Sequence, residues 1–583
     1  MLMSGFPNVE EQMVEAARAM AIFQDDQWLW EKYYPEGLSW HAPILQKPLF
    51  YILDQAAEKY PDNHLCDFQG KAFSYKKIAD TANRIAEGLQ KIGVKKGVKV
   101  GLFLPNTPYL IMFFYGILKT GATVVNYNPL YVERELASQI EDSETDIMVT
   151  IDLKFLMDKM TPMLAATRLK KVIVCDMAEI LPFPKNMLYP LVRSKDIAAA
   201  PENGRYIRFR DIVNNAGAPE PVMIDARNDV AVLQYTGGTT GTPKGAMLTH
   251  GNLYANVQQT VYWVRSIEPG KDTMMGVLPF FHVFAMTVVM NCSISAGMKI
   301  ILHPKFVLAD VLASIKKHRP SFFPAVPAIF SAIAASPDVG KIDFSCLKFC
   351  MSGGAPLPGD VKRLFEEKTR CRNLGEGYGL TETSPVATFS PSNGKIKNGS
   401  VGMPIPGTVI EIINRDDGIS VLPAGEKGEV CVSGPQVMKG YFNKPEETAL
   451  VLKHGRLHTG DVGYLDDEGY LFLVDRIKDM IMVRGYKVYP RFVEEAIYKH
   501  PAVEECIVAG VPDAERGETV WAWVKPFAGR DLSEEDLKKF LEDKLSPIEM
   551  PRKITLRDQP LPKTAVGKLS KKDLLEQEGI KKQ

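Results

Sequence analysis

The segment from Tyr235 to Gly245 combines the residue types that hold a polyphosphate. It reads YTGGTTGTPKG and follows the apolar run DVAVLQ, a pattern typical of a strand that ends in a turn. Glycines let backbone N–H groups approach an anion, threonine hydroxyls donate hydrogen bonds, and Lys244 adds a positive charge. The spacing excludes a Walker A loop. A flexible surface turn would explain the glycines but not the strand, threonines and lysine together. We therefore predict a phosphate-binding loop made of Thr236, Gly237, Gly238, Thr239, Thr240 and Lys244.

Two further glycine-rich segments follow. EGYGLTET, residues 376–383, offers Tyr378 for stacking on a base, Thr381 for a phosphate and Glu382 for a hard cation. A single carboxylate suffices for Mg²⁺ that bridges phosphates, because this ion takes most of its other ligands from phosphate and water. MSGGAPLP, residues 351–358, has paired glycines that let the backbone approach a flat ligand. Alone this second segment is weak, since many strand-to-helix turns resemble it.

The last third of the chain adds charged and small residues in four short motifs. These are LHTGDVG, DRIKD, RGYKV and PKTAVGKL, in that order. The residues that stand out in them are Asp461, Arg476, Lys478, Gly485, Lys487 and Lys568. A single lysine in a basic tail is usually solvated. Only the preceding motifs therefore give Lys568 a functional interpretation.

Taken together, these motifs closely resemble those of the AMP-forming acyl-adenylating superfamily, which includes acyl-CoA synthetases, adenylation domains and luciferases. The resemblance runs over roughly residues 45–575. It implies that Thr236 and Glu382 hold Mg²⁺ at the phosphates and that Lys568 is the catalytic lysine. It also implies a nucleotide pocket built from Gly353, Gly354, Ala355, Glu376, Gly377, Tyr378 and Thr381.

The same resemblance assigns the C-terminal motifs. Asp461 and Arg476 match the ribose contacts, and Lys478 matches the hinge between two domains. The segment with Gly485 and Lys487 matches the one that rotates towards the thiol acceptor. The wider segment 454–478 is similar to the signature of fatty-acyl-CoA synthetases. However, Arg456 and Tyr464 stand where tryptophan is common there, which bears on chain length and not on adenylation.

His282, in the sequence PFFHVF, admits two interpretations. A lone histidine among aromatic residues is usually a packed core residue. In the superfamily this position lies at the acyl and adenylate pocket. We expect His282 to position substrate and not to act as a general base, because a fatty carboxylate is already ionised at neutral pH.

The composition limits the classes of function. A chain of 583 residues is too long for one core, so we expect at least two domains. Lys+Arg and Asp+Glu both number 70, so no basic field favours nucleic acid. The closest cysteines, Cys346 and Cys350, lack a second pair or a histidine, which argues against a metal site and favours buried thiols in a reducing compartment. The N-terminus shows no pattern of a secretory signal.

Alternating apolar runs and amphipathic stretches predict an α/β fold with layered sheets. The expected strands are Val98–Leu104, Ala122–Tyr127, Asp146–Ile151, Lys171–Cys175, Val230–Tyr235, Met298–His303 and Leu347–Met351, and the clearest helices are Tyr75–Ile92 and Leu308–His318. Short strands between Gly, Pro and Asp turns at about 399–475 indicate a small β subdomain.

Beyond Asp475 we expect a compact α+β unit. Its predicted helices are Tyr489–His500 and Leu532–Leu545, the latter capped by Ser533, and its predicted strands are Glu505–Val511 and Thr519–Pro526. We divide the chain into an N-terminal adenylate-forming domain, 1–477, and a mobile C-terminal lid, 478–583. The hinge is expected at Val474–Lys478.

Two segments raise the question of membrane contact. Gly276–Met298 has no Asp, Glu, Lys or Arg and is long enough to span a bilayer, but its scattered polar residues fit a buried strand-turn-helix better. Leu181–Asp211 mixes apolar and aromatic residues with six Lys and Arg residues. Such a mixture can lie on an anionic membrane surface or pack on its own domain, and we slightly favour packing. A similar segment is familiar in bacterial long-chain acyl-CoA synthetases.

We therefore predict an ATP-dependent enzyme that converts a medium- or long-chain fatty acid to acyl-AMP and then to acyl-CoA, releasing pyrophosphate and AMP. The alternatives are an aryl-CoA ligase, a luciferase, an acyl-AMP ligase that feeds a carrier protein, a non-enzymatic lipid-binding or transport protein, and a regulatory nucleotide-binding module. The intact RGYKV motif favours CoA, and the presence of Glu382 and Lys568 favours an enzyme. Expected partners are fatty acid, ATP and CoA, with Mg²⁺ as cofactor and no nucleic acid. The protein is expected in the cytoplasm; a homodimer and peripheral contact with the inner face of the membrane remain open.

Overall fold

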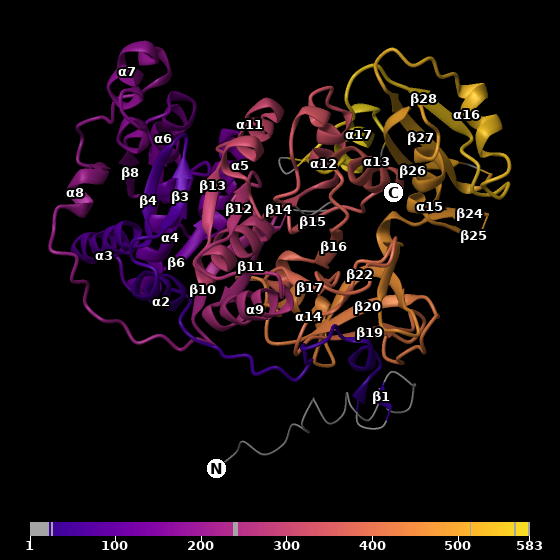
Figure 1. Cartoon of the computed structure of the whole chain (residues 1–583), viewed down its shortest axis with the longest axis horizontal. Coiled ribbons are helices and arrows are strands. Elements are labelled where there is room, and N and C mark those ends of the chain that lie inside the picture. Colours follow the sequence, from indigo (N-terminus) through magenta and orange to yellow (C-terminus); the bar gives the residue numbers. More distant parts are fainter. Residues whose placement is uncertain are drawn as a thin grey trace.

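The computed structural model describes residues 23–24 and 27–580, apart from 237–242, 485, 514 and 565–566. Within these residues the chain forms two large mixed sheets, a small antiparallel sheet, a separate C-terminal sheet and the short pair β1 (Phe23–Gln24) and β2 (Gln27–Trp28) (Figure 1). The predicted α/β class is confirmed.

The first large sheet has seven strands, in the order β11-β10-β6-β5-β7-β8-β9. Their bounds are β5 Lys99–Leu102, β6 Thr123–Asn126, β7 Ile147–Ile151, β8 Lys171–Cys175, β9 Tyr206–Arg208, β10 Val230–Thr236 and β11 Lys244–Thr249. All neighbours are parallel except β10 and β11. The antiparallel pair places Thr236 directly opposite Lys244 at the edge of this sheet, and residues 237–242 of the predicted phosphate loop lie outside the described residues.

The second large sheet has nine strands, in the order β18-β17-β16-β15-β14-β12-β13-β3-β4. Their bounds are β3 His64–Phe68, β4 Lys71–Ser74, β12 Thr273–Gly276, β13 Lys299–Leu302, β14 Phe322–Ala325, β15 Phe349–Gly353, β16 Leu374–Gly379, β17 Val386–Phe389 and β18 Met403–Pro404. The six strands from β3 to β16 along this order are parallel. In parallel sheets the loops beyond the carboxyl ends bind ligands, and the motifs after β15 and β16 occupy that position.

The antiparallel sheet corresponds to the predicted β subdomain. It consists of β19 Val409–Ile413, β20 Gly428–Ser433, β21 Leu452–Lys453, β22 Arg456–Leu465 and β23 Leu471–Arg476. Arg456 and Tyr464, which stand where tryptophan is common in fatty-acyl-CoA synthetases, lie in β22. Arg456 forms an ion pair with Glu411 at 3.2 Å, both side chains being buried, and Tyr464 stacks on Phe472 with ring centroids 5.1 Å apart.

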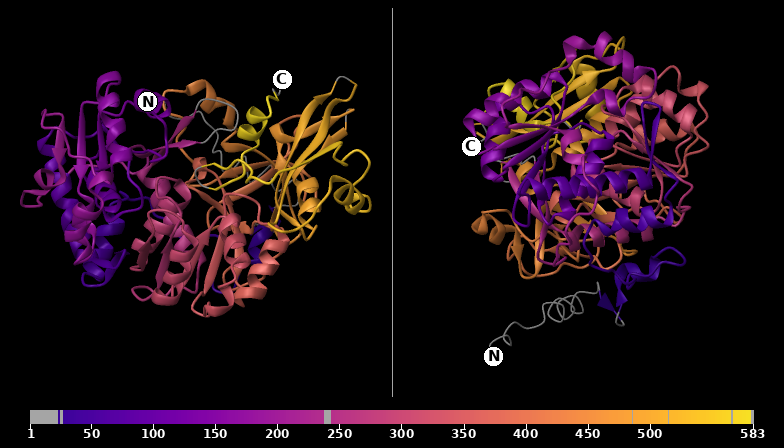
Figure 2. Two further views of the ribbon diagram at one scale, coloured as in Figure 1. Left: turned by 90° about the horizontal axis from the view of Figure 1, so that it is seen from above. Right: turned by 90° about the vertical axis from the view of Figure 1, so that its left-hand side faces the viewer.

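The C-terminal sheet packs its own apolar residues on both faces. Its strands are β24 Ile481–Val483, β25 Tyr486–Val488, β26 Val503–Asp513, β27 Gly517–Pro526 and β28 Lys553–Leu556. One cluster joins it to α15 and α16, and a second joins it to α17. The large N-terminal core ends at Leu471 and includes no residue of this sheet. Seen from above (Figure 2, left), the yellow C-terminal part lies to the right, and most of the indigo and purple elements lie at the left end of the molecule.

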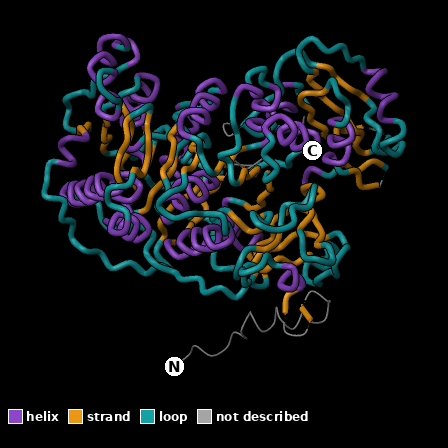
Figure 3. Tube along the Cα trace, viewed as in Figure 1, coloured by secondary structure: helices purple, strands orange, loops and turns teal. Residues whose placement is uncertain are grey.

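Helices lie against both large sheets (Figure 3). Their bounds are α2 Tyr51–Lys59, α3 Tyr75–Lys91, α4 Pro108–Lys119, α5 Glu133–Asp142, α6 Lys154–Ala166, α7 Lys185–Val192, α8 Phe209–Val213, α9 His250–Trp263, α10 Cys292–Ser295, α11 Leu308–His318, α12 Pro327–Ala335, α13 Gly359–Thr369, α14 Pro445–Val451, α15 Pro490–Tyr498, α16 Glu534–Leu541 and α17 Lys571–Gln577. Shorter helical turns are η1 Leu29–Tyr33, η2 Met177–Ile180, η3 Ser194–Asp196, η5 Val339–Lys341, η6 Thr381–Thr383 and η7 Ile477–Asp479, and η4 Ala285–Asn291 is a π-helix. α3 buries one amphipathic face and is capped by Ser74, whereas α4 is apolar on all sides and is buried almost throughout.

The predicted strands and helices agree with the structure to within one or two residues at most ends. Ser533 accepts a hydrogen bond from the Asp536 N–H and so caps α16, as predicted. Strand β3 and its edge neighbour β4 were not among the predicted strands, and neither were β9, β11, β12, β14, β16, β17 and β18. All eight cysteines are free thiols, and all but Cys346 are buried, as expected.

The uncharged segment Gly276–Met298 is a buried strand-turn-helix, as predicted. It runs from the end of β12 through a turn into the π-helix η4 and α10, and these helices bury nearly all their side chains. Among the residues that the structure describes, no helix has the length and hydropathy needed to cross a bilayer.

The segment Leu181–Asp211 divides into two parts. Its second half packs on the domain, because β9 pairs with β8 and Phe209 lies against Tyr109 with ring centroids 4.8 Å apart. Its first half forms α7, which buries none of its residues and projects at the upper left tip of the molecule (Figure 1).

Candidate active site

A single large cleft of about 2310 Å³ lies where the two large sheets, the antiparallel sheet and the C-terminal part meet. The predicted site residues that line it are Thr236, Lys244, His282, Gly353, Gly354, Ala355, Glu376, Gly377, Tyr378, Thr381, Glu382, Asp461, Arg476, Lys478 and Lys568. Lys487 does not line the cleft and is exposed on β25. Gly237, Gly238, Thr239, Thr240 and Gly485 lie outside the described residues.

Lys244 opens β11 at one wall of the cleft. Its ammonium pairs with Glu447 of α14 and lies 5.1 Å from the ring centroid of Tyr441. The backbone of Lys244 pairs with that of Thr236 on β10. An anion that enters here would have to compete with Glu447 for this lysine.

Glu382 lies on the short turn η6, just after β16. The Tyr441 hydroxyl donates to Glu382 Oε1 at 2.7 Å, and the Glu382 carbonyl accepts from the Met438 N–H at 2.8 Å. Both the side chain and the backbone of Glu382 are therefore fixed at the cleft wall. A fixed carboxylate in a cleft that Thr236 also lines fits the preference of Mg²⁺ for oxygen ligands.

Asp461 is an acid of the cleft with two side-chain partners. Its Oδ2 accepts from the Tyr378 hydroxyl at 2.7 Å, and its Oδ1 pairs with Arg476 Nε at 3.0 Å. Each carboxylate oxygen can accept more than one hydrogen bond, so Asp461 can still accept from two neighbouring hydroxyl groups. Tyr378 is hydrogen-bonded through its hydroxyl, which restricts the orientation of its ring.

Glu376 is a buried carboxyl next to the paired glycines of residues 353–354. Its Oε2 accepts from the Leu357 N–H at 3.2 Å. Burial raises the pKa of Glu376 to about 7, although nearby Arg491 opposes this shift. At neutral pH this side chain can therefore present either a carboxylate or a carboxyl hydroxyl to a ligand.

Gly354 provides the space in which Lys568 lies. Its φ is +81°, and a Cβ on this residue would stand 2.9 Å from Lys568 Cε. Burial, with Arg476 as the second cause, lowers the pKa of Lys568 to about 8. The C-terminal part thus places a cation beside the glycines that follow β15 of the N-terminal part.

His282 follows β12 and is half-buried at the same cleft. Burial, reinforced by the positive charge of Lys568, lowers the pKa of His282 to about 3. The imidazole is therefore neutral at physiological pH. Its ring Nδ1 lies 3.4 Å from the Phe284 N–H, which can donate to it.

An apolar cavity of about 30 Å³ lies behind the cleft, between α9, η4, α10 and the second large sheet. Val288, Cys292 and Met298 of the uncharged segment line it, and Met351 lines both the cavity and the cleft. A volume of this size holds about one water molecule. A longer apolar ligand would have to move these side chains apart.

Sequence patterns did not identify several residues that organise the cleft. Tyr441 orients Glu382, and Glu447 pairs with Lys244. Arg491 of α15 donates its N–H to Asp475 at 2.9 Å and its Nη1 to the Leu473 carbonyl at 2.8 Å, which joins the C-terminal part to β23. Each of these residues is separated from its partner by 16 to 203 positions, so no local motif contains the pair.

Comparison with known proteins defines the class. Residues 53–442 match the AMP-binding enzyme family, and residues 493–568 match the AMP-binding enzyme C-terminal domain. The chain belongs to this family.

Individual relatives cover almost the whole chain. A long-chain-fatty-acid–CoA ligase of Bacillus subtilis is 42% identical, covering 94% of this chain and 98% of the relative. A probable 4-coumarate–CoA ligase of Dictyostelium discoideum is 33% identical, covering 91% and 95%. Among solved structures, ATP-bound MatB from Rhodopseudomonas palustris superposes with a TM-score of 0.80 at 28% identity, covering 91% of this chain and 99% of that one.

Proposed function

We propose that this protein is an ATP-dependent, AMP-forming fatty-acid–CoA ligase that acts on long-chain acids. The relatives named as long-chain-fatty-acid–CoA ligases support the reaction and its substrate class. The observation that carries the proposal is structural. Lys244, Glu382, Asp461 and Lys568, which come from four distant motifs, line one cleft.

In the first half-reaction the fatty carboxylate attacks the α-phosphorus of ATP, and pyrophosphate leaves. No base is required, because the carboxylate is ionised at neutral pH, and a neutral His282 fits a positioning role. Catalysis then depends on orientation and on charge stabilisation. We assign Thr236 and Lys244 to the leaving phosphates, Asp461 and Arg476 to the ribose, and Lys568 to the oxygens that gain charge.

Glu382, held by Tyr441, is the carboxylate that would hold Mg²⁺, with Thr236 as a second oxygen ligand. When bound, Mg²⁺ neutralises phosphate oxygens and orients the pyrophosphate.

For the second half-reaction we propose that residues 478–583 rotate as a lid about Lys478 relative to residues 1–477. Rotation would withdraw Lys568 from Gly354 and bring β24 and β25, with Lys487 and the sequence neighbour Gly485, to the cleft. Lys487 is exposed in the described orientation, so it is free to approach a new partner. The CoA thiol then attacks the acyl carbonyl, and AMP leaves.

The acyl chain is assigned to the apolar cavity behind Met351. Each methylene buried there should contribute about 0.8 kcal/mol of binding until the space is filled. The cavity has room for only about one water molecule. An acyl chain can therefore enter it only if Val288, Met298 or Met351 changes rotamer. We therefore expect specificity to rise with chain length and then stop.

ATP–pyrophosphate exchange measured over acids from acetate to oleate tests this assignment. Rates that climb from acetate to palmitate support it. Better use of acetate or of a coumarate-like acid than of octanoate and palmitate contradicts it and favours an aryl-CoA or short-chain ligase. Thioester analysis with CoA and with a carrier protein separates a CoA ligase from an acyl-AMP ligase.

We further propose that α7 makes peripheral contact with an anionic membrane surface. Five large apolar side chains are exposed around it: Phe183 78%, Met187 65%, Leu188 50%, Leu191 76% and Val192 74%. Lys185, Arg193 and Lys195 flank them. Apolar side chains that enter the interface and cations that attract anionic headgroups act together in such contacts.

Vesicle co-sedimentation tests the contact. Binding should require anionic lipid and weaken as salt screens the charges, and Leu191→Ser should reduce it. Met223→Ser is the matched control, because Met223 is 91% exposed on the loop between α8 and β10. Equal binding to neutral vesicles at high salt contradicts the electrostatic mechanism. Absence of binding to either lipid contradicts the membrane proposal.

A further inference from the structure

The pairing of β20 with β22 is interrupted where β22 reaches the cleft. Glu429 pairs with Val462, and Cys431 pairs with His458, so Thr459–Asp461 of β22 stand opposite the single residue Val430. Such a bulge re-aims side chains and is frequent beside active sites. Here it carries Asp461, whose carboxylate meets Tyr378 and Arg476.

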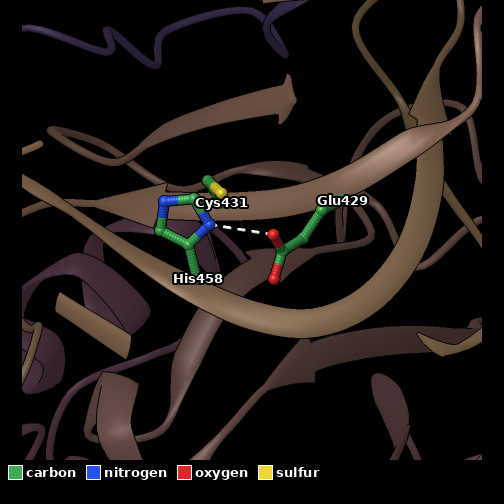
Figure 4. Close-up of side chains that lie close together, drawn as sticks. All are labelled: Glu429, Cys431 and His458. Carbon is green, nitrogen blue, oxygen red and sulfur yellow. Dashed lines mark hydrogen bonds and ion pairs between the residues drawn. The ribbon is translucent and has the colours of Figure 1, made fainter. Parts of the chain in front are cut away.

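Polar contacts from β20 hold the bulge in place. The Gly460 N–H donates to Glu429 Oε1 at 3.0 Å, and His458 Nδ1 lies 2.8 Å from Glu429 Oε2. Figure 4 shows His458 and Glu429 facing each other across the strands, with Cys431 beside them. Thr459 completes the network by donating to the Val430 carbonyl at 2.6 Å and accepting from the Asp461 N–H at 3.1 Å.

Glu429 contacts both the residue before the bulge, His458, and the central residue of the bulge, Gly460. Burial would raise its pKa, but the hydrogen bonds from His458 and Gly460 outweigh burial and lower it. The carboxylate is therefore ionised at neutral pH, when both of its contacts are strongest. Gly460 has a φ of +71°, a conformation that favours glycine and that the Glu429 contact stabilises.

The same side chains raise the question of a metal site. Within the described part of the chain, Glu429, Cys431 and His458 form the single group whose oxygen, sulfur and nitrogen atoms all lie within 4.8 Å of one another. These are ligand types of zinc. However, the 2.8 Å contact between His458 and Glu429 joins two of the three groups directly, and both carboxylate oxygens of Glu429 are engaged. A polar clamp accounts for the arrangement.

We propose that Glu429 is a positioning residue for nucleotide binding, because it clamps the β22 bulge and so presents Asp461 to the ribose hydroxyls. The inference rests on the proposed function, in which Asp461 binds the ribose. It predicts that loss of the clamp weakens only those contacts that depend on the ribose hydroxyls. Phosphate and adenine contacts come from other elements and should not change.

The test compares dissociation constants for ATP and 2′,3′-dideoxy-ATP, with the KM for ATP and kcat from pyrophosphate exchange. Glu429→Ala should raise the Kd and KM for ATP about 3- to 10-fold, as expected for one lost hydrogen-bonding partner, and leave kcat within about twofold. The Kd for the dideoxy nucleotide should be unchanged. Glu429→Gln should retain most of the affinity, because its amide oxygen can still accept from Gly460. Glu429→Asp, which withdraws the carboxylate by one methylene, should resemble Glu429→Ala and serves if that variant does not fold.

Glu87→Ala is the matched control. Glu87 has the same 16% side-chain exposure as Glu429, accepts from the Ala218 N–H at 2.8 Å and pairs with Lys91. It lies on α3 and does not line the cleft. It should leave both nucleotide affinities unchanged.

Three results overturn the inference. If Glu429→Ala and Glu429→Asp still bind ATP more tightly than the dideoxy nucleotide by the same factor as the unmodified protein, the positioning role of Glu429 is refuted. The ribose role of Asp461 would stand. Equal affinity of the unmodified protein for both nucleotides refutes the ribose role of Asp461, and the clamp with it, but leaves the ligase reaction intact. Equimolar zinc that is retained through purification and lost in Glu429→Ala and Cys431→Ser identifies the cluster as a metal site instead.

Discussion

Lys568→Ala should separate the two half-reactions. In the described orientation of the C-terminal part, the ammonium lies in the cleft beside Gly354. If the lid rotates for thioester formation, Lys568 leaves the cleft before the thiol arrives. Its removal should therefore slow formation of acyl-AMP and spare the reaction of preformed acyl-AMP with CoA.

The size of the effect follows from the electrostatics of Lys568. Its pKa falls from 10.5 to about 8, which corresponds to ~3 kcal/mol against the charged form in the empty cleft. Negative charge that develops on the phosphoryl and carboxylate oxygens removes this penalty and adds an attraction. Loss of one preorganised charge-stabilising donor typically costs about 10²–10³ in rate, a range of the same size. We expect that loss in pyrophosphate exchange.

The assay pairs pyrophosphate exchange with single-turnover thioester formation from synthetic acyl-AMP. Lys538→Ala is the control, since Lys538 lies on α16 and pairs with Glu534. It should affect neither step. The reasoning is refuted if Lys568→Ala slows both steps equally.

Four further outcomes are expected. Gly485→Leu should show the reverse pattern of Lys568→Ala, with pyrophosphate exchange retained and acyl-CoA output lost; loss of exchange would contradict the rotation. Because protonated Lys568 is the active form and its pKa is about 8, kcat/KM for exchange should fall as pH rises through about 8, and Lys568→Arg should remove this decline because guanidinium stays charged. Tyr441→Phe, which deletes the hydroxyl that orients Glu382, should raise the Mg²⁺ concentration for half-maximal rate about 10-fold; an unchanged Mg²⁺ titration would dissociate Tyr441 from the metal. Arg491→Ala, which removes the bond to the Leu473 carbonyl, should speed limited proteolysis near Lys478 and slow exchange; unchanged cleavage would show that this bond does not restrain the lid.

Much of the fold could be predicted from local patterns in the sequence. The strands β8 and β10 and the helices α3 and α11 each carry an uninterrupted periodic pattern, and their ends lie close to the predicted positions. β3 and β4 escaped prediction because HLCDF and KAFS are short and polar at one end. They are strands because β3 pairs with β13, more than two hundred residues away.

Some residues of the site could likewise be found from local motifs, and others could not. Glu382 and Asp461 could be found because each lies in a compact motif after a strand. Tyr441 could not, since it reaches Glu382 across 59 positions. Arg476 and Tyr378 were found as motif residues, but their contacts with Asp461 follow from the pairing of β22 with β23 and from packing against β16. The bulge at Thr459–Asp461 was likewise invisible, because a bulge is defined by the strand opposite and not by its own sequence.

The separate packing of the C-terminal sheet has a consequence for the balance between lid orientations. Apolar clusters cover both faces of that sheet within residues 481–580, so a rotation would leave them packed and expose little new apolar surface. The free-energy difference between orientations would then depend on a few polar contacts, such as those of Arg491 and Lys568 with β23 and the cleft. A ligand can shift such an equilibrium only by its difference in affinity for the two states, and about 1.4 kcal/mol of difference changes their ratio tenfold. ATP, which adds charge beside Lys568, would favour one population, and release of pyrophosphate would return the lid towards the other.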